Sequence, residues 1–450
     1  MIFIDIGVVK QMQINKLVIN RLRNVSFGVL AIAFAFAMQI VLAPHAHATT
    51  YNLSPTPALG ECNIYDAIDA INTSAISGGC EAGTGSNTIN LSAGTYTFIT
   101  TPNPVTFNGD LTINGAGATS TIIDGNSFSG LNYSPTNSNY TLTLSNLTMQ
   151  NFTTSPATGV AIASFNGNLV ASHLLIHDNT CTDEALPICA LFVNDAEGTT
   201  QSVTFRDSAV YSNSATGLIS AGNTNGSALN MNIINNTFYG NDGIILAFFN
   251  AVEGSTNTVN FVNNTVSHNN FPFEAGWLSL NFGAEVDTGI SNVNVKNNIF
   301  DSNASGSTPN NCGPNSSTNG HVFTDGGNVS SDDTCNTFFT GTNDKNSTDP
   351  QLAAPAMINN TYILALNSGS PALDNGISGG LTPDNDQRGV TRPQGSSPDS
   401  GAYELEVATP GLPNTGNSAL ANMSSILGAL AVGLIAFGGT VLARKSFKRK

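Results

Sequence analysis

Positively charged residues are scarce in this sequence. Only 14 of its 450 residues are Lys or Arg, against 30 Asp or Glu. Nine of the 14 lie before residue 25 or after residue 443, and the body between them has five cations, 29 acids and a net charge of about −24. Nucleic acids and polyanionic glycans bind to clustered Lys and Arg, so this composition excludes the former and disfavours the latter. The five cations are Arg206, Lys296, Lys345, Arg388 and Arg392.

Cysteine is also sparse, and its six residues stand as three neighbouring pairs. These pairs are Cys62 with Cys80, Cys181 with Cys189, and Cys312 with Cys335. Three local disulfides are typical of an exported protein, and each of the longer loops contributes about 3 kcal/mol on the chain-entropy estimate. The paired CxxC spacing of a structural zinc site is absent, so the sequence predicts neither a metal nor a cofactor.

Asparagine, in contrast, is abundant and recurs in a fixed phrase of alternating apolar and polar residues. The clearest copies are Met231 to Asn241, Val259 to Asn269 and Val293 to Asn303. Self-similarity of this period indicates a solenoid, and the alternation indicates strands. The sequence therefore predicts an all-β, right-handed parallel β-helix over residues 111–348. The closing asparagines of five copies, at intervals of 34, 28, 28 and 34, are Asn179, Asn213, Asn241, Asn269 and Asn303.

These five asparagines are expected to stack in one column. Equivalent residues of successive coils lie about 4.8 Å apart, which lets one side-chain amide donate to the carbonyl of the next. Asn also tolerates the left-handed backbone of a tight corner. A simpler alternative is that Asn is common in the loops of an Asn-rich chain. The coil that ends near Asn151 fits the repeat only with a one-residue shift, with Leu142 and Leu144 out of phase.

The N-terminal part predicts export followed by a cap. Residues 1–48 combine basic residues, an apolar run and Ala46-His47-Ala48, as a signal peptide does, with a retained membrane anchor as the alternative. Residues 49–110 are expected to hold a helix with apolar residues at helical spacing from Ile64 to Ile71, which covers the open end of the solenoid. Asn87 to Phe98 and Leu111 to Asp124 are expected to form the first strands.

The C-terminal part predicts attachment to a surface. A separate block at residues 349–409 precedes a linker at 410–422, an apolar span at 423–443 that is long enough for a transmembrane helix, and a basic tail at 444–450. Leu412, Pro413, Asn414, Thr415 and Gly416 stand in the linker. These three parts in this order resemble the cell-wall sorting signal of Gram-positive surface proteins. The resemblance implies that a sortase cleaves after Thr415 and joins it to a peptidoglycan precursor; a plain membrane anchor is the alternative.

Two further motifs resemble a family of bacterial surface β-helix proteins. Cys62–Ile68, Gly79-Cys80 and Leu91–Tyr96 are similar to the N-terminal block named for a CSLREAI motif, although Tyr65-Asp66 stands where that motif has Arg-Glu. Four segments resemble the close of the choice-of-anchor Q domain. The resemblance implies a pectin-lyase-like β-helix displayed outside the cell, and no particular activity. The four segments are Gly369–Asp374, Asp386–Gly389, Arg392-Pro393 and Asp399–Glu404.

Catalysis finds little support in the sequence. Lyase chemistry uses Lys or Arg, and the solenoid holds only Arg206 and Lys296. For hydrolysis, Asp178, Asp207, Asp242 and Asp301 fall in different columns of the repeat. The remaining acid pairs are Asp195 with Glu197 and Glu285 with Asp287, each about 6.6 Å apart if they lie on a strand, although solvated loop acids or a calcium site explain them as well.

The longer intervals between asparagines mark insertions, which often form the binding face of a solenoid. The second insertion contains Trp277, which with Phe271 and Phe273 forms either a sugar-stacking platform or a small apolar cluster. His177 and His268 are expected at the surface. The sequence therefore predicts an exported, wall-anchored adhesin or glycan-binding stalk, with a glycan or host-cell ligand. A polysaccharide-active hydrolase is the alternative.

Overall fold

The computed structural model describes most of the chain between residues 48 and 406. The described ranges are 48–153, 161–181, 188–194, 198–222, 226–249, 254–271, 278–279, 290–313 and 320–406. Within these ranges, no helix has the length and apolar character required to cross a membrane. The expected signal peptide, sorting motif and C-terminal span lie outside them.

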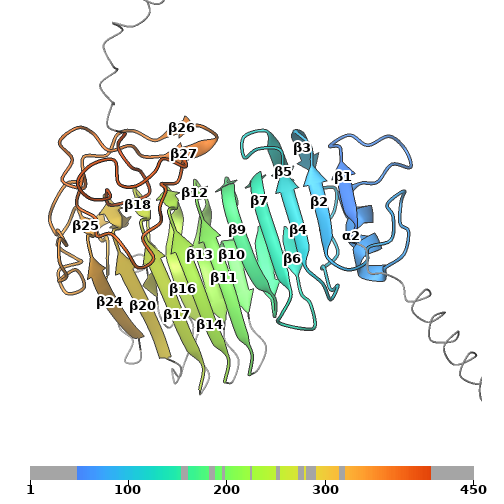
Figure 1. Ribbon diagram of the computed structural model, residues 1–450, viewed down its shortest axis with the longest axis horizontal. Helices are drawn as coiled ribbons and strands as arrows, with labels where there is room; N and C mark the ends of the chain where they lie inside the picture. The colour runs from blue at the N-terminus through green and yellow to red at the C-terminus, as the bar shows by residue number, and fades with distance from the viewer. Residues whose placement is uncertain are drawn as a thin grey trace, which may run out of the picture.

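The described chain winds into a right-handed parallel β-solenoid, as predicted (Figure 1). Three runs of strands follow its axis, and within each run every strand is parallel to the next. The first run is β1 (Thr50–Leu53), β2 (Asn87–Leu91), β4 (Leu111–Gly115), β7 (Thr141–Gln150), β9 (Asn168–His177), β11 (Thr200–Arg206), β14 (Ala228–Ile234), β17 (Thr256–Val262), β20 (Ile290–Lys296) and β24 (Gly320–Gly326).

The other two runs complete each coil. The second run, which the ends of β7 and β9 join, is β3 (Gly94–Thr97), β5 (Thr121–Asp124), β12 (Ala209–Tyr211), β15 (Thr237–Tyr239), β18 (Thr265–Ser267), β21 (Ile299–Asp301) and β25 (Val329–Ser330). The third run is β6 (Leu131–Tyr133), β8 (Ile162–Phe165), β10 (Ile188–Asn194), β13 (Ser214–Gly222), β16 (Asp242–Phe249) and β19 (Leu278–Ser279). Hairpins β22–β23 (Ala304–Ser305, Thr308–Pro309) and β26–β27 (Ala356–Ile358, Thr361–Ile363) lie outside these runs.

The alternation of the sequence places one face of each strand inside the coil. In β17, Val259 and Phe261 are fully buried, while Asn260 between them is partly exposed. The ring of Phe261 stacks between Phe238 and Phe300, each with ring centroids 6.1 Å away. Burial of a Phe side chain contributes about 3–5 kcal/mol, judged by replacement with Ala. Stacked apolar columns of this kind hold neighbouring coils together.

The five closing asparagines form a buried ladder. Each donates its side-chain N–H to the Oδ1 of the next, at 2.8 Å from Asn179 to Asn213 and 2.9 Å from Asn269 to Asn303. The same Oδ1 atoms also accept the backbone N–H of the preceding ladder residue. The ladder therefore satisfies the polar groups of a corner where the chain has no strand partner. It ends on Asn311, which accepts from Asn303 at 2.9 Å.

A second buried ladder lies at the corner between the first and second runs of strands. It runs from Asn236 through Asn264 and Asn298 to Asn328, with amide-to-carbonyl distances of 3.1, 3.2 and 3.0 Å. Both ladders donate toward the C-terminal end, where aligned N–H groups leave partial positive charge. A carboxylate lies at the end of each ladder and offsets this charge. Asp344 accepts the side-chain N–H of Asn328 in the second ladder, and Asp332 accepts the backbone N–H of Asn311 in the first. The arrangement resembles the favourable placement of charge at a helix terminus.

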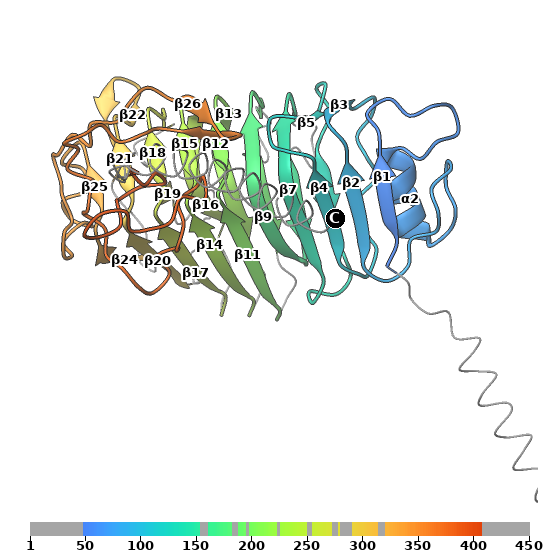
Figure 2. The same ribbon diagram turned by 45° about the horizontal axis from the view of Figure 1, so that its top comes forward.

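The predicted N-terminal cap and disulfides are confirmed. Helix α2 (Ile64–Thr73) begins after Asn63, whose side chain accepts from the backbone of Tyr65 and Asp66, and it buries Ile64, Ala67, Ile68, Ala70 and Ile71. Figure 2 shows the helix beside β1 at the end of the solenoid. Cys62 and Cys80, Cys181 and Cys189, and Cys312 and Cys335 form disulfides.

Two details of the expected register were wrong. The first strand is β1, which precedes the predicted one; only Tyr51 and Leu53 of its four residues are apolar and buried, too short a pattern to recognise. Leu142 and Leu144 are in phase, since Leu142 pairs with Leu169 of β9. The coil needs no shift, because Phe152, and not Asn151, occupies the ladder position, and its backbone N–H donates to Asn179.

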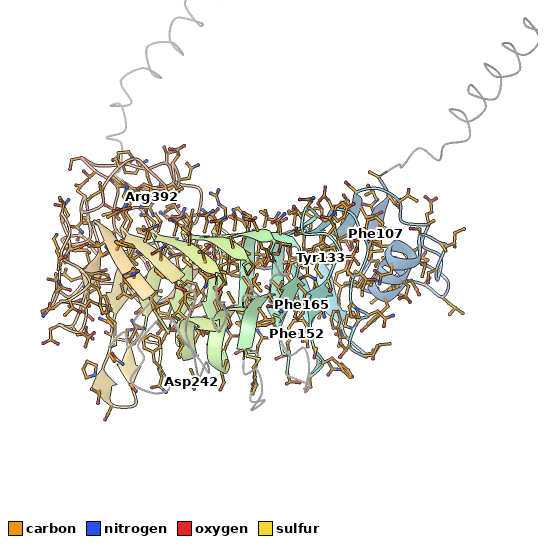
Figure 3. The ribbon with its side chains drawn as sticks, turned by 90° about the horizontal axis from the view of Figure 1, so that it is seen from below. Phe107, Tyr133, Phe152, Phe165, Asp242 and Arg392 are labelled. Atoms are coloured by element: carbon orange, nitrogen blue, oxygen red, sulfur yellow. A yellow bond between two sulfur atoms is a disulfide. The ribbon has the colours of Figure 1, made fainter. Side chains whose placement is uncertain are left out.

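Residues 349–406, here called the C-terminal block, fold back along the corner between the first and second runs of strands. Asn235, Asn263 and Asn297 share a left-handed backbone there, and each donates its amide to a backbone carbonyl of the block at 2.7–3.1 Å. Inside the block Arg392 pairs with Glu404 at 2.8 Å, and both side chains are 1% exposed. Figure 3 shows Arg392 at the end of the molecule opposite Phe107. A buried pair like this holds the block's loops in one arrangement.

Candidate functional site

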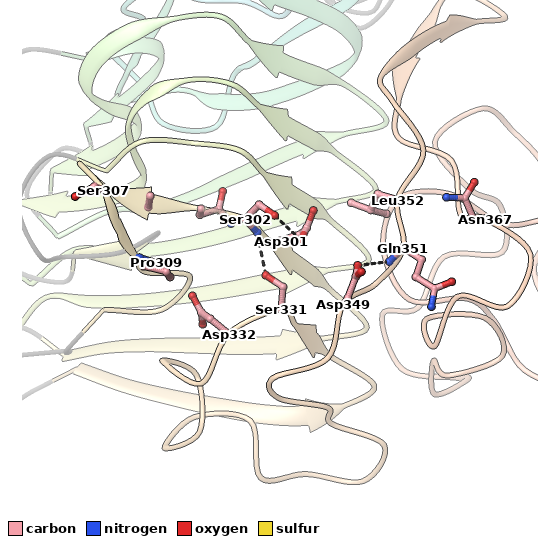
Figure 4. A pocket seen from close by; sticks show the side chains of 12 residues that line it. Asp301, Ser302, Ser307, Pro309, Ser331, Asp332, Asp349, Gln351, Leu352 and Asn367 are labelled. Carbon is pink, nitrogen blue, oxygen red and sulfur yellow. Dashed lines mark hydrogen bonds between the residues drawn. The ribbon is translucent and has the colours of Figure 1, made fainter.

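An open pocket of about 800 Å³ lies between the last solenoid coils and the C-terminal block. Figure 4 shows Asp301 and Ser302 on its solenoid side, facing Leu352 and Asn367 of the block. A volume of this size lies within the range of small-molecule and oligosaccharide sites. The lining is Asp301, Ser302, Asn303, Ala304, Ser307, Pro309, Ser331, Asp332, Asp349, Gln351, Leu352 and Asn367. We call it the C-terminal pocket.

The three carboxylates of this pocket differ in how firmly they are held. Asp301 accepts from Ser302 Oγ at 2.9 Å and from Ser267 Oγ at 3.2 Å, and it is 8% exposed. Asp332 accepts from Asn311 N and from both the N–H and hydroxyl of Thr334, which fixes it as part of the ladder end. Asp349 is exposed and accepts only the N–H of Gln351, at 2.8 Å, among the contacts described. Asp349 is therefore the carboxylate most available to a ligand.

The five Lys and Arg residues of the body all contact acids or backbone carbonyls outside the C-terminal pocket. Lys296 Nζ donates to Gly379 O at 2.6 Å and Lys345 Nζ to Pro371 O at 2.7 Å, and burial lowers the pKa of both. Arg206 forms an ion pair with Asp207. Within the C-terminal block, Arg388 forms one with Asp386 and Arg392 forms one with Glu404. The lining described for the C-terminal pocket contains neither Lys nor Arg. The site therefore suits a ligand without acid groups. Its described lining offers no Lys or Arg that could serve in lyase chemistry.

A second pocket, of about 390 Å³, lies nearer the N-terminus. Burial acts to raise the pKa of its Asp124, but hydrogen bonds from Gln150, Asn151 and the N–H of Asn126 outweigh burial and lower that pKa. Asp124 is therefore ionised at neutral pH and serves as a hydrogen-bond acceptor. We call this site the N-terminal pocket, and its lining is Thr97, Asp124, Asn126, Ser127, Asn151, Phe152, Thr153, Asp178 and Thr180.

The two pockets use the same positions of the repeat. Asp124 and Asp301 belong to one column, because the strand registers link them through Gln150, His177, Tyr211, Tyr239 and Ser267. Asp178 and Ser302 occupy the next position, and both have a left-handed backbone. Thr180 and Ala304 occupy the position after the ladder residue, linked by isolated parallel bridges. The solenoid sides of the two pockets therefore come from the same positions of the repeat, and the C-terminal block adds a second side only to the C-terminal pocket.

A row of aromatic rings lies between the pockets and was missed from the sequence. His177 stacks on Tyr211 at 4.6 Å, and Tyr211 stacks on Tyr362 of the C-terminal block at 4.0 Å. Tyr239 lies 6.1 Å from Tyr362 and 5.5 Å from His268. His177 is thus only partly a surface residue, whereas His268 is exposed as expected. Reading the column two residues before each closing Asn would have found His177, Tyr211 and Tyr239.

The row of rings formed by His177, Tyr211 and Tyr239, here called the ring row, contacts Tyr362 and so helps to hold the C-terminal block on the solenoid. Both faces of Tyr211 are covered, by His177 and by Tyr362. Burial, with the nearby Tyr362 and Asp178, raises the pKa of the Tyr211 hydroxyl. The hydroxyl of Thr119 also hydrogen-bonds Asn360 of the same hairpin. Neither face of the Tyr211 ring is therefore free to stack on a sugar.

Several sequence candidates lie outside the described residues. They include both acid pairs and most of the proposed stacking platform, since only Phe271 is described, and it is 1% exposed. Asp207 is paired with Arg206 at the block-covered corner, away from both pockets. In the described part of the chain, no group of three or more His, Cys, Asp or Glu side chains is placed to hold a metal ion. The undescribed candidates are Asp195, Glu197, Phe273, Trp277, Glu285 and Asp287.

Comparison with known proteins adds little beyond the fold. No protein-family model and no curated protein matches the chain. Pectate lyase Pel9A is a similar solved structure, with 15% identity, a TM-score of 0.37, and coverage of 80% of this chain and 98% of the lyase. The PL6 family alginate lyase AlyGC shows 12% identity, a TM-score of 0.23, and coverage of 81% and 59%. Scores this low carry no argument about activity.

Proposed function

We propose that this chain is a surface-displayed β-helix protein that binds carbohydrate without acid groups in the C-terminal pocket. The observation that carries the proposal is the lining of that pocket, in which carboxylate, amide and hydroxyl groups surround about 800 Å³ of open space. Such groups are the natural partners of sugar hydroxyls. The exposed carboxylate of Asp349 and the amide of Gln351 supply acceptors and donors from one loop. Leu352 adds an apolar surface for a sugar ring.

Charge decides which carbohydrates fit. Three carboxylates line the pocket, and all five cations of the body are engaged by acids or backbone carbonyls. A polyuronate would bring its own carboxylates against them without a counter-charge, which is unfavourable at any distance within the Debye length. Neutral and amine-bearing sugars carry no such penalty. The proposal therefore excludes pectate and alginate as preferred ligands.

A panel of immobilised glycans tests this proposal. We expect the protein to bind acid-free glycans and Asp349→Asn to bind them several-fold more weakly, because one acceptor becomes a mixed donor and acceptor. Asp384→Asn is the matched control, since Asp384 is an exposed acid of the same block outside both pockets. Retention on polyuronates alone, or equal loss in the two variants, would overturn the proposal.

A hydrolase is the second candidate, because the C-terminal pocket offers two carboxylates, Asp301 and Asp349, that are not fixed in the ladder end. Glycoside hydrolysis needs one such group as acid and another as base or nucleophile. Release of reducing ends from a bound glycan, lost in Asp301→Asn and in Asp349→Asn, would favour the enzyme. Binding without release favours the binding protein.

Wall attachment completes the proposal and is supported by the sequence alone. The order of Leu412–Gly416, apolar span and basic tail provides for a sortase and a peptidoglycan precursor as partners, with passage through the membrane before sorting. A rigid solenoid joined to the wall after its C-terminal block would hold the binding surface outside the cell. The protein would then act as an adhesin or glycan-binding stalk.

A further inference from the structure

An exposed strip of polar side chains connects the two pockets. Between the coil of Asp178 and the coil of Ser302, the chain turns the same corner at Ser212, Gly240 and His268, and all three are exposed. The position after the ladder residue is exposed as well, at Ser214, Asp242 and Asn270. Figure 3 shows Asp242 at the margin of the solenoid. We call these two columns, from Asn151 and Thr153 to Ser302 and Ala304, the ladder strip.

The buried asparagine ladder keeps this strip regular. It lies directly beneath, between the two exposed columns, and its amide hydrogen bonds hold successive corners at one spacing. The corner residues all share a left-handed backbone, with φ of 53° at Ser212, 60° at Gly240 and 56° at His268. Each coil therefore repeats the same outward geometry. The strip advances about 4.8 Å per coil, which is close to the advance of one sugar in an extended β-1,4-linked chain.

We propose that the ladder strip binds one extended polysaccharide chain parallel to the solenoid axis, about one sugar per coil, with its ends in the two pockets. This inference rests on the proposed function and specifies its ligand: a β-1,4-linked chain whose sugars carry no acid groups. From Asn151 to Ser302 the strip crosses six coils, so about six sugars fill it. The C-terminal block leaves the strip open: Ser212, Gly240 and His268 are exposed, although Tyr362 of the block stacks on Tyr211 in the neighbouring column.

The chemistry of the strip suits such a chain along its whole length. Successive coils present two hydroxyls, a carboxylate and an amide in one column, at Thr180, Ser214, Asp242 and Asn270. Asn270 donates to Asp242 at 3.0 Å, which fixes the carbonyl and carboxylate oxygens of two neighbouring coils as acceptors. The strip contains neither Lys nor Arg in the described coils. It therefore excludes polyuronates by the same charge argument as the pocket.

A series of β-1,4-linked oligosaccharides of two to eight sugars, titrated into the full chain by calorimetry, tests this inference. We use cello- and chito-oligosaccharides as probes and oligogalacturonates as the acidic comparison. The association constant should rise with length by at least about tenfold in total and level off at about six sugars. The acidic series should bind at least about tenfold more weakly at equal length.

A blocking variant separates the strip from the pocket. Ser214→Arg places a long side chain in the middle of the strip and should abolish the gain with length, while binding of the shortest sugars stays unchanged. Ser202→Arg is the matched control, because Ser202 is an exposed Ser of the same coil on the outer face of β11. Its length profile should equal that of the unmodified protein.

The outcomes distinguish the two proposals. Equal affinity for short and long oligosaccharides, unaffected by Ser214→Arg, would overturn the strip and leave the C-terminal pocket as the binding site. A length profile lost equally in Ser202→Arg would also overturn the strip. Absence of binding by every probe, acidic series included, would overturn the proposed function and the strip together.

Discussion

The carboxylate of Asp344 accepts the side-chain N–H of Asn328 at 2.9 Å, at the donor end of the ladder that begins at Asn236. It also accepts the backbone N–H of Asn328 at 2.8 Å and the hydroxyl of Thr324 at 2.6 Å. A negative charge at this point meets the aligned N–H dipoles of the stacked amides. The ladder thus ends on a group that satisfies its last donor.

Loss of this carboxylate should destabilise the C-terminal coils. Asp344→Ala removes the acceptor for several donors, each of which costs roughly 1–3 kcal/mol when left buried and unsatisfied. We expect hydrogen exchange to accelerate in β24 and β25 more than in β2 and β4, measured by mass spectrometry. Asp325→Ala, an exposed acid of β24, is the control. Equal exchange in the two variants would contradict the role assigned to Asp344.

The buried ladder should matter more than the exposed amides of the same coil. Asn264 is fully buried and Asn260 is partly exposed, although both belong to asparagine rows with bonds of about 3 Å. Asn264→Ala should lower the free energy of unfolding by about 1–3 kcal/mol and Asn260→Ala by less than about 1 kcal/mol. Urea titration followed by circular dichroism measures both. A larger loss in Asn260→Ala would contradict this account.

The ring row should hold the C-terminal block on the solenoid. Tyr362→Ala removes the ring stacked 4.0 Å from Tyr211, and aromatic pairs of this kind contribute about 0.5–1.5 kcal/mol. Limited proteolysis should then cut the β26–β27 hairpin faster. Tyr362→Phe keeps the ring and should behave as the unmodified protein. Unchanged cleavage of the Ala variant would show that the hairpin is held by other contacts.

Stability should depend on pH through Asp399. Burial raises the pKa of this carboxyl to about 6, against the opposing hydrogen bonds from Leu405 and Asp374, and Glu404 adds to the increase. The unfolded carboxyl has a pKa of about 3.9, so the folded protein binds the proton more tightly between these values. The contribution is complete below about pH 4 and is lost as the pH rises through about 6.

Asp399→Asn removes this titration. We expect its melting temperature to vary less between about pH 4 and pH 7 than that of the unmodified protein, whatever the absolute offset from replacing an acceptor. Differential scanning calorimetry at several pH values gives both slopes. Parallel slopes would show that Asp399 does not titrate in this window.

Wall attachment has its own test. Thr415→Ala should move the protein from the wall fraction to the membrane or the medium, because the proposed sortase link forms at Thr415. Asn414→Ala, at the variable position of the motif, is the control and should stay in the wall. Fractionation and immunoblotting measure the distribution. Unchanged wall attachment of the Thr415 variant would contradict the sorting signal.

The sequence predicted the solenoid because its signals are local and repeated. The spacing of Asn213, Asn241 and Asn269 fixes the coil length, and the alternation around Val259 fixes which face is buried. Helix α2 could be placed because Ile64, Ala67 and Ile68 recur at helical spacing. A signal that recurs in several coils is stronger than any single propensity.

The candidate site could not be predicted in the same way. The C-terminal pocket joins Asp301 to Asp349 and Asn367, which come together only because the C-terminal block folds back along the solenoid. The contact of Tyr362 with Tyr211 depends on that same packing, and no sequence period links the two residues. The longer intervals between asparagines do not mark either pocket, because the solenoid residues of both pockets occupy regular positions of the repeat.

The central claim, that the C-terminal pocket binds a carbohydrate without acid groups, is tested most directly by a crystal structure of the protein with a bound β-1,4-linked tetrasaccharide. We expect the sugar between Asp301 and Asp349, with its hydroxyls hydrogen-bonded to Asp349 and Gln351. A tetrasaccharide bound at another surface, with this pocket empty, would contradict the claim.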